Sequence, residues 1–153
     1  MVKKWPLTEE EFNTIYAKVP RVTVEVLVVG PKGVYLTLRD IEPCKGQWHL
    51  PGGTVFFDES LLETVQRIAE RELGIQVTHA EPVGVIEYPS HYKKAPDHQN
   101  AIDHPIGIVH KVTQYKGTPG FNNEAKNAGW FTKLPENAHA DQDVYLKSNG
   151  YIK

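Results

Sequence analysis

Runs of β-branched residues alternate along this chain with stretches in which apolar residues recur every three or four positions. The first pattern predicts strands and the second predicts helices. Strands that flank a central helix, with further helices toward both ends, predict one domain over residues 1–153 with an α/β/α sandwich around a mixed β-sheet. The predicted strands are 22–29, 34–39, 82–88, 105–115 and 127–131, and the predicted outer helices are 8–18 and 141–149.

The central helix follows a glycine turn at Gly53 and a short loop. Asp58 can cap the start of this helix, and Ser60 with Glu63 offers a capping box one turn later. Gly74 tolerates a left-handed backbone and is expected to end the helix. The apolar residues at helical spacing are expected to form the buried face: Leu62, Val65, Ala69 and Leu73.

Length and composition narrow the classes of protein to which the chain can belong. A chain of 153 residues fits one domain with one sizeable core. A net charge of −2 and a pI near 6.4 do not show the excess of positive charge that is typical of nucleic-acid-binding proteins. No apolar run approaches the roughly 20 residues that cross a bilayer, and no basic leader precedes an apolar segment, so no membrane partner is expected. The single Cys44 excludes a metal site made of cysteines and fits a cytoplasmic protein.

The stretch 53–75 resembles the signature of the Nudix family, G-x5-E-x7-R-E-U-x-E-E-x-G-U, in which U is a bulky apolar residue. Ile68 and Arg71 stand where the signature has glutamates. The resemblance implies the Nudix fold and the hydrolysis of a nucleoside diphosphate derivative. The residues that match with correct spacing are Gly53, Glu59, Arg67, Glu72, Gly74 and Ile75.

The two departures fall on one flank of the central helix. At about 100° per residue, positions 68, 71 and 72 lie close together, whereas Glu70 projects about 160° away from Glu72. Three carboxylates on this flank would bind two or three hard cations through oxygen. Glu72 is the carboxylate that remains there. We therefore expect Glu72 to be a metal ligand, with a solvated surface acid as the alternative.

Outside the signature, the chain is most similar to the GDP-mannose mannosyl hydrolases within the family. That branch lacks the same two glutamates and has a similar approach to the signature, here Leu38-Arg39-Asp40 through Gly46 and Trp48 to Pro51-Gly52-Gly53. The branch binds one divalent metal between nucleotide phosphates and protein oxygens. The resemblance implies that the Gly52 carbonyl, Glu72 and Glu124 bind Mg²⁺ (or Mn²⁺).

The general base of that branch does not carry over to this chain. The branch has a glutamine followed by a histidine base, where this chain has Glu124 followed by Ala125. Glu124 could therefore be the base or the third metal ligand. Arg39 matches an arginine that contacts the diphosphate leaving group, a role that suits the two parallel donors of a guanidinium. A solvated charge at the end of a strand is the alternative for Arg39.

Histidines are further candidates for the base, because their ordinary pKa lies near neutrality. His104 stands where the mannosyl branch also has a histidine, so we expect it to be catalytic, and we expect His91 to bind substrate. Solvated loop histidines are the alternative. A transition-metal site could also form in or beside the predicted loop 89–103, although its spacing matches no metal template. Its members would be His91, His98, His104, Asp97 and Asp103.

Arg71 stands where the consensus has a glutamate and the mannosyl branch has a small apolar residue. At about 4 Å and an effective dielectric near 20, a guanidinium repels a divalent ion by several kcal/mol. We expect Arg71 to exclude a second metal and to bind a phosphate oxygen of the substrate. The alternative is that Arg71 pairs with a nearby acid or extends into solvent.

These residues lead us to expect a Nudix-type hydrolase of a nucleotide sugar similar to GDP-mannose, acting with a divalent metal and an activated water. A homodimer is also expected. Two alternatives stay open. One is an ordinary Nudix diphosphatase that cleaves at phosphorus, and the other is a non-catalytic Nudix domain that binds a nucleotide-like effector.

Overall fold

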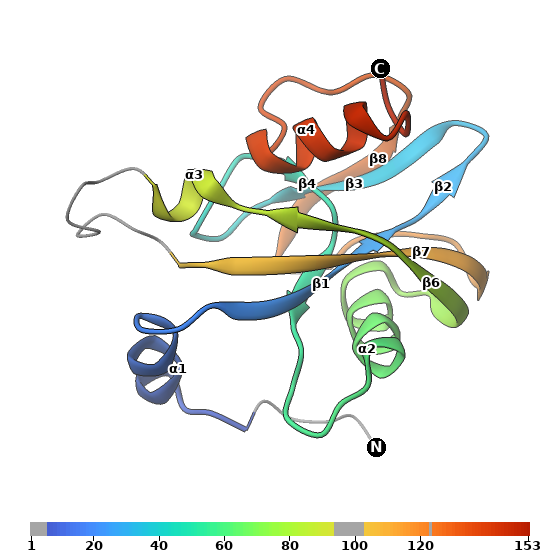
Figure 1. Ribbon diagram of the computed structural model, residues 1–153. Coiled ribbons are helices and arrows are strands. Elements are labelled where there is room, and N and C mark those ends of the chain that lie inside the picture. Colours follow the sequence, from blue (N-terminus) through green and yellow to red (C-terminus); the bar gives the residue numbers. More distant parts are fainter. Residues whose placement is uncertain (1–5, 94–102, 123) are drawn as a thin grey trace.

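The computed structural model describes residues 6–93, 103–122 and 124–153 (Figure 1). In these residues the predicted strands and helices follow one another in the predicted order, with four short elements added. The elements are α1 Glu9–Tyr16, β1 Arg21–Leu27, β2 Val29–Gly30, β3 Gly33–Arg39, β4 Trp48–His49, β5 Gly52–Thr54, α2 Leu61–Leu73, β6 Gln76–Glu87, α3 Pro89–Tyr92, β7 Pro105–Lys116, β8 Ala125–Phe131 and α4 Ala140–Ser148.

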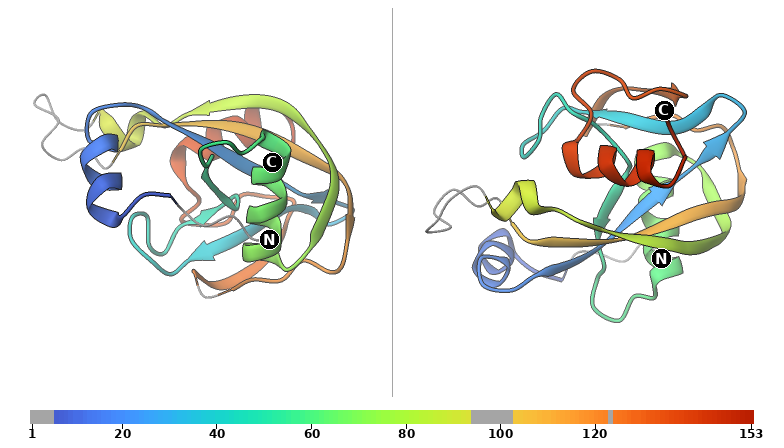
Figure 2. Two further views of the ribbon diagram at one scale, coloured as in Figure 1. Left: turned by 90° about the horizontal axis from the view of Figure 1, so that it is seen from below. Right: turned by 45° about the horizontal axis from the view of Figure 1, so that its top comes forward.

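Two four-stranded sheets form the centre of the molecule. The first has the order β5-β1-β7-β6, and the second has the order β2-β3-β4 with β8 also paired to β3. Strands β1 and β7 run parallel, whereas β5 and β6 join this pair antiparallel, which makes the first sheet mixed. Helices α2 and α4 lie on opposite sides of the β1–β7 pair (Figures 1 and 2). The predicted α/β/α arrangement around a mixed sheet is confirmed.

Helix α2 begins and ends at two of the residues that the sequence predicts. The Ser60 side chain accepts from the amide of Glu63, the Glu63 carboxylate accepts from the amide of Ser60, and Gly74 closes the helix with a φ of 69°. Asp58 precedes the cap and is not the N-cap residue. Leu62 is 40% exposed, so its predicted burial is wrong. The buried face instead includes Val65, Ile68, Ala69 and Leu73.

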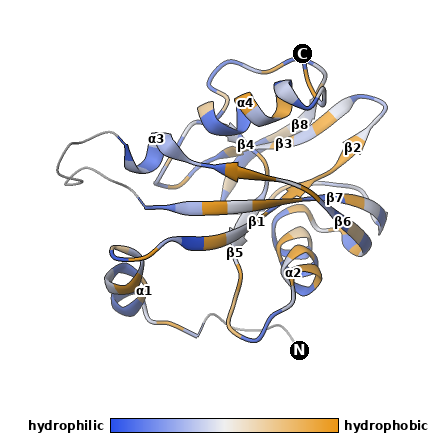
Figure 3. Cartoon of the chain, in the orientation of Figure 1, coloured by the Kyte–Doolittle hydropathy of each residue, from blue (hydrophilic) through white to orange (hydrophobic). Residues whose placement is uncertain are grey.

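Ile68 lies in the core although the family signature has a glutamate at this position. Its side chain is fully buried in a cluster with residues of β1, β6 and β7. A second cluster fills the space between the other side of this sheet and β3, β4 and α4, and includes Leu36, Leu50 and Leu146. Figure 3 shows apolar residues along β6 and β7, between the two helical layers. None of the helices in the described residues is long and apolar enough to cross a membrane.

Strand β6 is longer than predicted because it tolerates a proline at a bulge. The prediction begins at Pro82, but the strand begins at Gln76 and its pairing with β7 shifts register between Pro82 and Gly84. A bulge removes the ladder hydrogen bond that proline cannot donate. Similarly, Pro89 opens the short helix α3 inside the segment that is predicted to be a loop.

Candidate active site

A cavity of about 550 Å³ lies where β1, β5, α3 and the loop after β3 come together. It contains most of the residues that the sequence singles out. A small second cavity adjoins it and is lined by Glu72, Arg39, His49 and Glu124. The predicted residues that line the main cavity are Arg39, Gly52, Arg71, His91 and Glu124.

Glu72 lies in the last turn of α2 with only 8% of its surface exposed. Its Oε1 is 3.3 Å from Nη2 of Arg71, whereas its buried Oε2 has no hydrogen-bond partner among the described residues. Burial raises the pKa of Glu72 to about 7, with Glu124 raising it further and Arg71 opposing the shift. A buried oxygen without a partner is unfavourable. A hard cation would satisfy it, so the site fits a divalent metal.

Glu124 is brought beside Glu72 by hydrogen bonds at the start of β8. The amide of Glu124 donates to Oδ1 of Asn122 at 3.1 Å, and the amide of Asp40 donates to the carbonyl of Glu124 at 2.9 Å. The Asn122 side-chain amide also donates to the carbonyl of Arg71 in α2. These contacts tie the turn before β8 to the end of the helix that carries Glu72.

Gly52 pairs with Glu25 of β1 in the first sheet. A Cβ at this position would overlap Oε2 of Glu25, so the close approach of β5 to β1 requires glycine. Gly52 also lines the main cavity with Glu124. Glu124 also lines the small cavity with Glu72. A backbone carbonyl and carboxylates are the kind of oxygen donors that Mg²⁺ prefers.

Arg39 and Arg71 are two of the four arginines that line the main cavity. Arg39 ends β3, and its Nε donates to the carbonyls of Ile41, at 3.0 Å, and of Pro43. These bonds hold the loop that follows β3. Arg71 pairs with Glu72 and keeps 44% of its side chain exposed. The alternative that Arg71 pairs with a nearby acid therefore agrees with the structure, and the side chain still lines the cavity.

His104 lies between Asp103 and Pro105, which both line the main cavity. Its carbonyl accepts from the amide of Arg21 at the start of β1, and its ring packs against that of Tyr92, tilted by 31°, with 4.0 Å between the ring centroids. Among the described residues, those lining either cavity do not include His104. His98 and Asp97, named with it in the predicted loop, lie outside the described residues.

Glu25 is a site residue that the sequence analysis misses. It lies in β1 with 6% of its surface exposed and lines the main cavity. Its Oε1 accepts from the Tyr88 hydroxyl at 2.8 Å and from the Thr23 hydroxyl at 3.2 Å. Burial raises the pKa of Glu25 to about 7, although these hydroxyls and the charge of Arg21 oppose the shift. The feature of the sequence that points to Glu25 is a charged residue inside the β-branched run 22–29, which is predicted to be a strand.

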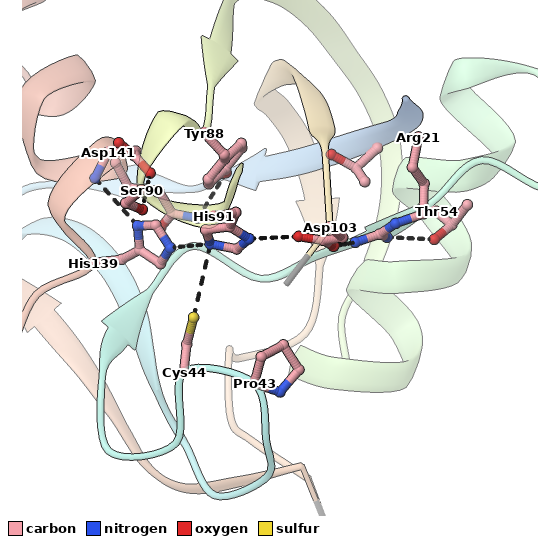
Figure 4. A network of polar contacts seen from close by, with 12 residues as sticks. Arg21, Pro43, Cys44, Thr54, Tyr88, Ser90, His91, Asp103, His139 and Asp141 are labelled. Atoms are coloured by element: carbon pink, nitrogen blue, oxygen red, sulfur yellow. Dashed lines mark hydrogen bonds and ion pairs between the residues drawn. The ribbon is translucent and has the colours of Figure 1, made fainter. Parts of the chain in front are cut away.

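Cys44 and His139 are also missed, and both meet His91 in the wall of the cavity (Figure 4). His91 Nε2 lies 2.8 Å from His139 Nε2 and 3.8 Å from the Cys44 sulfur. On its other side, Nδ1 of His91 lies 2.6 Å from Asp103, whose carboxylate also pairs with Arg21. The sequence gives no pattern for this group because its members come from three separate segments.

Charges shift the pKa values within this group. Burial alone would lower the pKa of His91, but Asp103 and Cys44 together raise it to about 9. His139 and His91 lower the pKa of the Cys44 thiol to about 6, against the effect of burial. Hydrogen bonds from His91 and Arg21 lower the pKa of Asp103, although its burial acts in the opposite direction. In each case the neighbouring side chains together outweigh the effect of burial on the pKa.

Two further signature residues hold the loop before α2. Arg67 makes two hydrogen bonds to Glu59, at 2.8 and 2.9 Å, and donates to the carbonyl of Thr54 at 2.8 Å. Its guanidinium also lies 3.6 Å from the centre of the Phe56 ring. Although burial raises the pKa of Glu59, Arg67 and the hydroxyl of Thr64 lower it to about 2. This part of the signature therefore positions the loop that leads from β5 to α2.

Comparisons with known proteins agree on the family. Among curated proteins, the low-salt glycan biosynthesis protein Agl8 of Haloferax volcanii is 39% identical over 82 residues, 54% of this chain and 53% of that protein. The chain thus matches about half the length of that relative. Among solved structures, a MutT Nudix hydrolase from Burkholderia pseudomallei is 27% identical, with a TM-score of 0.72 over 85% of this chain and 98% of that one.

A second solved structure shares the fold at lower identity. The Nudix domain of Shewanella oneidensis NrtR, crystallised with ADP ribose, is 19% identical, with a TM-score of 0.63 over 94% of this chain and 97% of that one. The family model of the NUDIX domain matches residues 19–145, more than half of the chain. On this match and on the signature carried by α2 and its preceding loop, the chain belongs to the Nudix family of hydrolases.

Proposed function

We propose that this protein hydrolyses a nucleotide sugar of the GDP-mannose type, using a divalent metal and an activated water. The observation that carries the proposal is the buried Oε2 of Glu72, which has no hydrogen-bond partner in the described part of the chain and lies beside Glu124 in the small cavity. The similarity to the mannosyl hydrolase branch supports the sugar nucleotide. So does the 39% identity to a protein whose name places it in glycan biosynthesis.

The metal would be held by the Gly52 carbonyl and by the carboxylates of Glu72 and Glu124, and Mg²⁺ (or Mn²⁺) suits these oxygen donors. When bound, such an ion neutralises charge on a diphosphate and orients it. Glu72 must be ionised to act as a ligand. Its pKa of about 7 reflects burial beside a second carboxylate, so a cation at this position would favour the ionised form.

The cationic side chains of the cavity would bind the diphosphate. Arg39 and Arg71 line the same cavity as Glu124, and each guanidinium can offer paired donors to phosphate oxygens. His91 lines the same cavity, and where no ion is bound at its Nε2 its pKa is raised to about 9. A cationic imidazole facing the cavity is suited to an anionic group of the substrate.

A water must lose a proton near neutral pH, and Glu25 is the group best suited to accept it. A general base works best when its pKa lies near the working pH. Glu25 faces the cavity with a pKa of about 7, and two hydroxyl donors orient its carboxylate. Glu124 is then free to serve as the third ligand. His104 packs against Tyr92 and is not among the described residues that line the cavity, so the geometry favours the two glutamates over this histidine for both roles.

Product analysis distinguishes the open reactions. The purified protein is incubated with GDP-mannose, other nucleotide sugars and ADP-ribose in the presence of Mg²⁺, and the products are identified by ³¹P NMR in ¹⁸O-labelled water. Attack at the sugar carbon gives an intact nucleoside diphosphate and ¹⁸O in the sugar. Attack at phosphorus gives a nucleoside monophosphate and ¹⁸O in a phosphate. Tight binding of a nucleotide without any product would overturn the enzyme proposal in favour of a binding domain.

A further inference from the structure

We propose that Cys44, His91 and His139 form a second metal site, for a transition-metal ion of the zinc class. This site is separate from the oxygen donors around Glu72 and Glu124. It would join three segments of the cavity wall: the loop after β3, helix α3 and the residue that caps α4. The proposal does not depend on the substrate or the reaction proposed above.

The three side chains converge with spacings close to those of a metal centre. All three ligand atoms lie within 4.8 Å of one another, with 2.8 Å between the two Nε2 atoms and 3.8 Å from the Cys44 sulfur to His91 Nε2. Around tetrahedral zinc, two nitrogens lie about 3.3 Å apart and a sulfur and a nitrogen lie about 3.6 Å apart. The His91–His139 and Cys44–His91 spacings are therefore each within roughly half an ångström of the value that zinc requires, and the Cys44–His139 spacing is at most 4.8 Å.

The chemistry of the donors selects the class of metal. One sulfur and two imidazole nitrogens suit Zn²⁺ and related transition metals, whereas Mg²⁺ and Ca²⁺ take oxygen ligands. Both histidines are more than nine-tenths buried, at 8% and 5% exposure. Because all three residues line the cavity, a fourth coordination position is accessible to a water molecule. The sulfur and nitrogen donors would thus bind a transition metal, and the oxygen donors around Glu72 would bind Mg²⁺.

Asp103 supplies the outer contact that metal-binding histidines usually have. Nδ1 of His91 lies 2.6 Å from Asp103, and Arg21 holds the same carboxylate from the other side (Figure 4). A carboxylate that accepts from Nδ1 fixes the ring and leaves the Nε2 lone pair for a metal. Here this arrangement directs Nε2 toward Cys44 and His139.

The position of His139 disfavours a simple cysteine nucleophile in this cluster. A Cys–His pair needs the Nε2 lone pair of His91 to accept the thiol proton. Nδ1 of His139 accepts the amide of Asp141 at 3.2 Å, so in the neutral ring the proton lies on Nε2 and faces His91. The shorter contact of His91 is thus to His139 and not to Cys44. A bound ion would replace that proton and satisfy all three donors together.

Cobalt provides a direct test, because thiolate and imidazole ligands give Co²⁺ a characteristic spectrum. The metal-stripped full chain is titrated with Co²⁺ in excess Mg²⁺, which occupies the oxygen donors, and Zn²⁺ is then added as a competitor. The expected result is one Co²⁺ per chain with intense tetrahedral bands and a sulfur-to-cobalt charge-transfer band, all removed by stoichiometric Zn²⁺. Zn²⁺ should also raise the Tm of the wild-type protein.

Conservative variants separate the ligands from the fold. Cys44→Ser should remove the charge-transfer band. His139→Asn keeps a side-chain acceptor at the cap of α4 but removes the metal-binding nitrogen, and should weaken binding by at least about tenfold. Asp103→Asn should weaken it by roughly 10- to 100-fold, as loss of an outer contact does. His79→Gln, on the exposed surface of β6, serves as the control and should bind as the wild type does.

Two results would overturn the proposal. The first is a Co²⁺ spectrum without a charge-transfer band that is unchanged in Cys44→Ser and His139→Asn. The second is a weak octahedral spectrum that Glu72→Gln abolishes, because the ion would then occupy the oxygen donors. Circular dichroism of each variant confirms that it is folded before its binding is compared with that of the wild type.

Discussion

Glu25 and Glu72 are buried carboxyl groups whose pKa values both lie near 7, but their surroundings differ. Glu25 accepts from two hydroxyl groups, whereas Oε2 of Glu72 has no partner among the residues that the structure describes. A carboxylate held by hydroxyl donors suits proton transfer, and one with an unpartnered oxygen suits a cation. At the scale of single residues, this difference supports the proposal that Glu25 is the base and Glu72 is a metal ligand.

With saturating Mg²⁺, which keeps Glu72 ionised, the rate should fall on the acid side of about pH 7, because protonation of Glu25 removes the base. Glu25→Gln should lower kcat by at least about 10²-fold and abolish this acid limb. Tyr88→Phe removes a hydrogen bond that lowers the pKa of Glu25, so the limb should move to higher pH. A pH–rate profile measured for the three proteins checks this, and an unchanged acid limb in Glu25→Gln would exclude Glu25 as the base.

Glu124 should matter more than His104. Glu124→Ala removes a proposed ligand at the edge of both cavities and should lower kcat by at least about 10²-fold. His104→Ala loses only a ring contact with Tyr92 outside the cavity and should retain most of the activity. Steady-state kinetics of both variants, with circular dichroism as the folding control, compare them. If His104→Ala is the more damaging change, the assignment of Glu124 is wrong.

Arg71 should limit the oxygen site to one ion. Its guanidinium lies 3.3 Å from Glu72. A second cation beside Glu72 would need the carboxylate that the signature has at position 71, and this chain has a positive charge there instead. Mg²⁺ stoichiometry, measured by calorimetry with a non-hydrolysable nucleotide, should be one for the wild type and two for Arg71→Glu. Two tightly bound Mg²⁺ ions in the wild type would contradict this role of Arg71.

At the scale of elements, the signature segment shows what a local pattern can and cannot predict. The capping box of Ser60 and Glu63 and the glycine that ends α2 depend on neighbours in sequence, and all three are predicted correctly. The exposure of Leu62 and the partner of Arg67 depend on how α2 packs against β5 and its loop. The sequence shows neither, and the structure gives Glu59 as that partner.

The Glu59–Arg67 pair should make the fold sensitive to acid. The folded-state pKa of Glu59, about 2, lies below the ordinary value of 4.5, so its stabilisation is present above about pH 4.5 and is lost as the pH falls toward 2. At pH 7, Glu59→Gln should lower the free energy of unfolding by about 1–3 kcal/mol. The difference from the wild type should shrink toward pH 2. Thermal unfolding of both proteins between pH 2 and 7 measures it, and a pH-independent difference would contradict the charge-based account.

At the scale of the whole molecule, the site divides into residues that the signature reveals and residues that only the fold brings together. Glu72 and Gly52 lie in or directly before the signature, so their positions follow from it. His91 meets Cys44 and His139 across 47 and 48 residues of chain, and no local periodicity encodes such contacts. Glu25 reaches the cavity because β1 lies between β5 and β7 in the sheet.

The expected homodimer also belongs to this scale and stays a prediction. Analytical ultracentrifugation at several protein concentrations should give twice the chain mass of 17.3 kDa. A single species at the chain mass throughout the concentration series would contradict it. The proposed cavity lies within one chain, so either result is compatible with the metal and substrate assignments.

The most direct test of the account measures Mg²⁺-dependent turnover of GDP-mannose by the wild type and by Glu72→Gln. Glutamine keeps the size of the side chain and a neutral carbonyl oxygen but removes the charge that holds a hard cation. The account predicts turnover in the wild type that chelator abolishes, and no measurable turnover in Glu72→Gln with an unchanged circular dichroism spectrum. Equal turnover by the two proteins, or turnover that survives excess chelator, would contradict the central role given to Glu72.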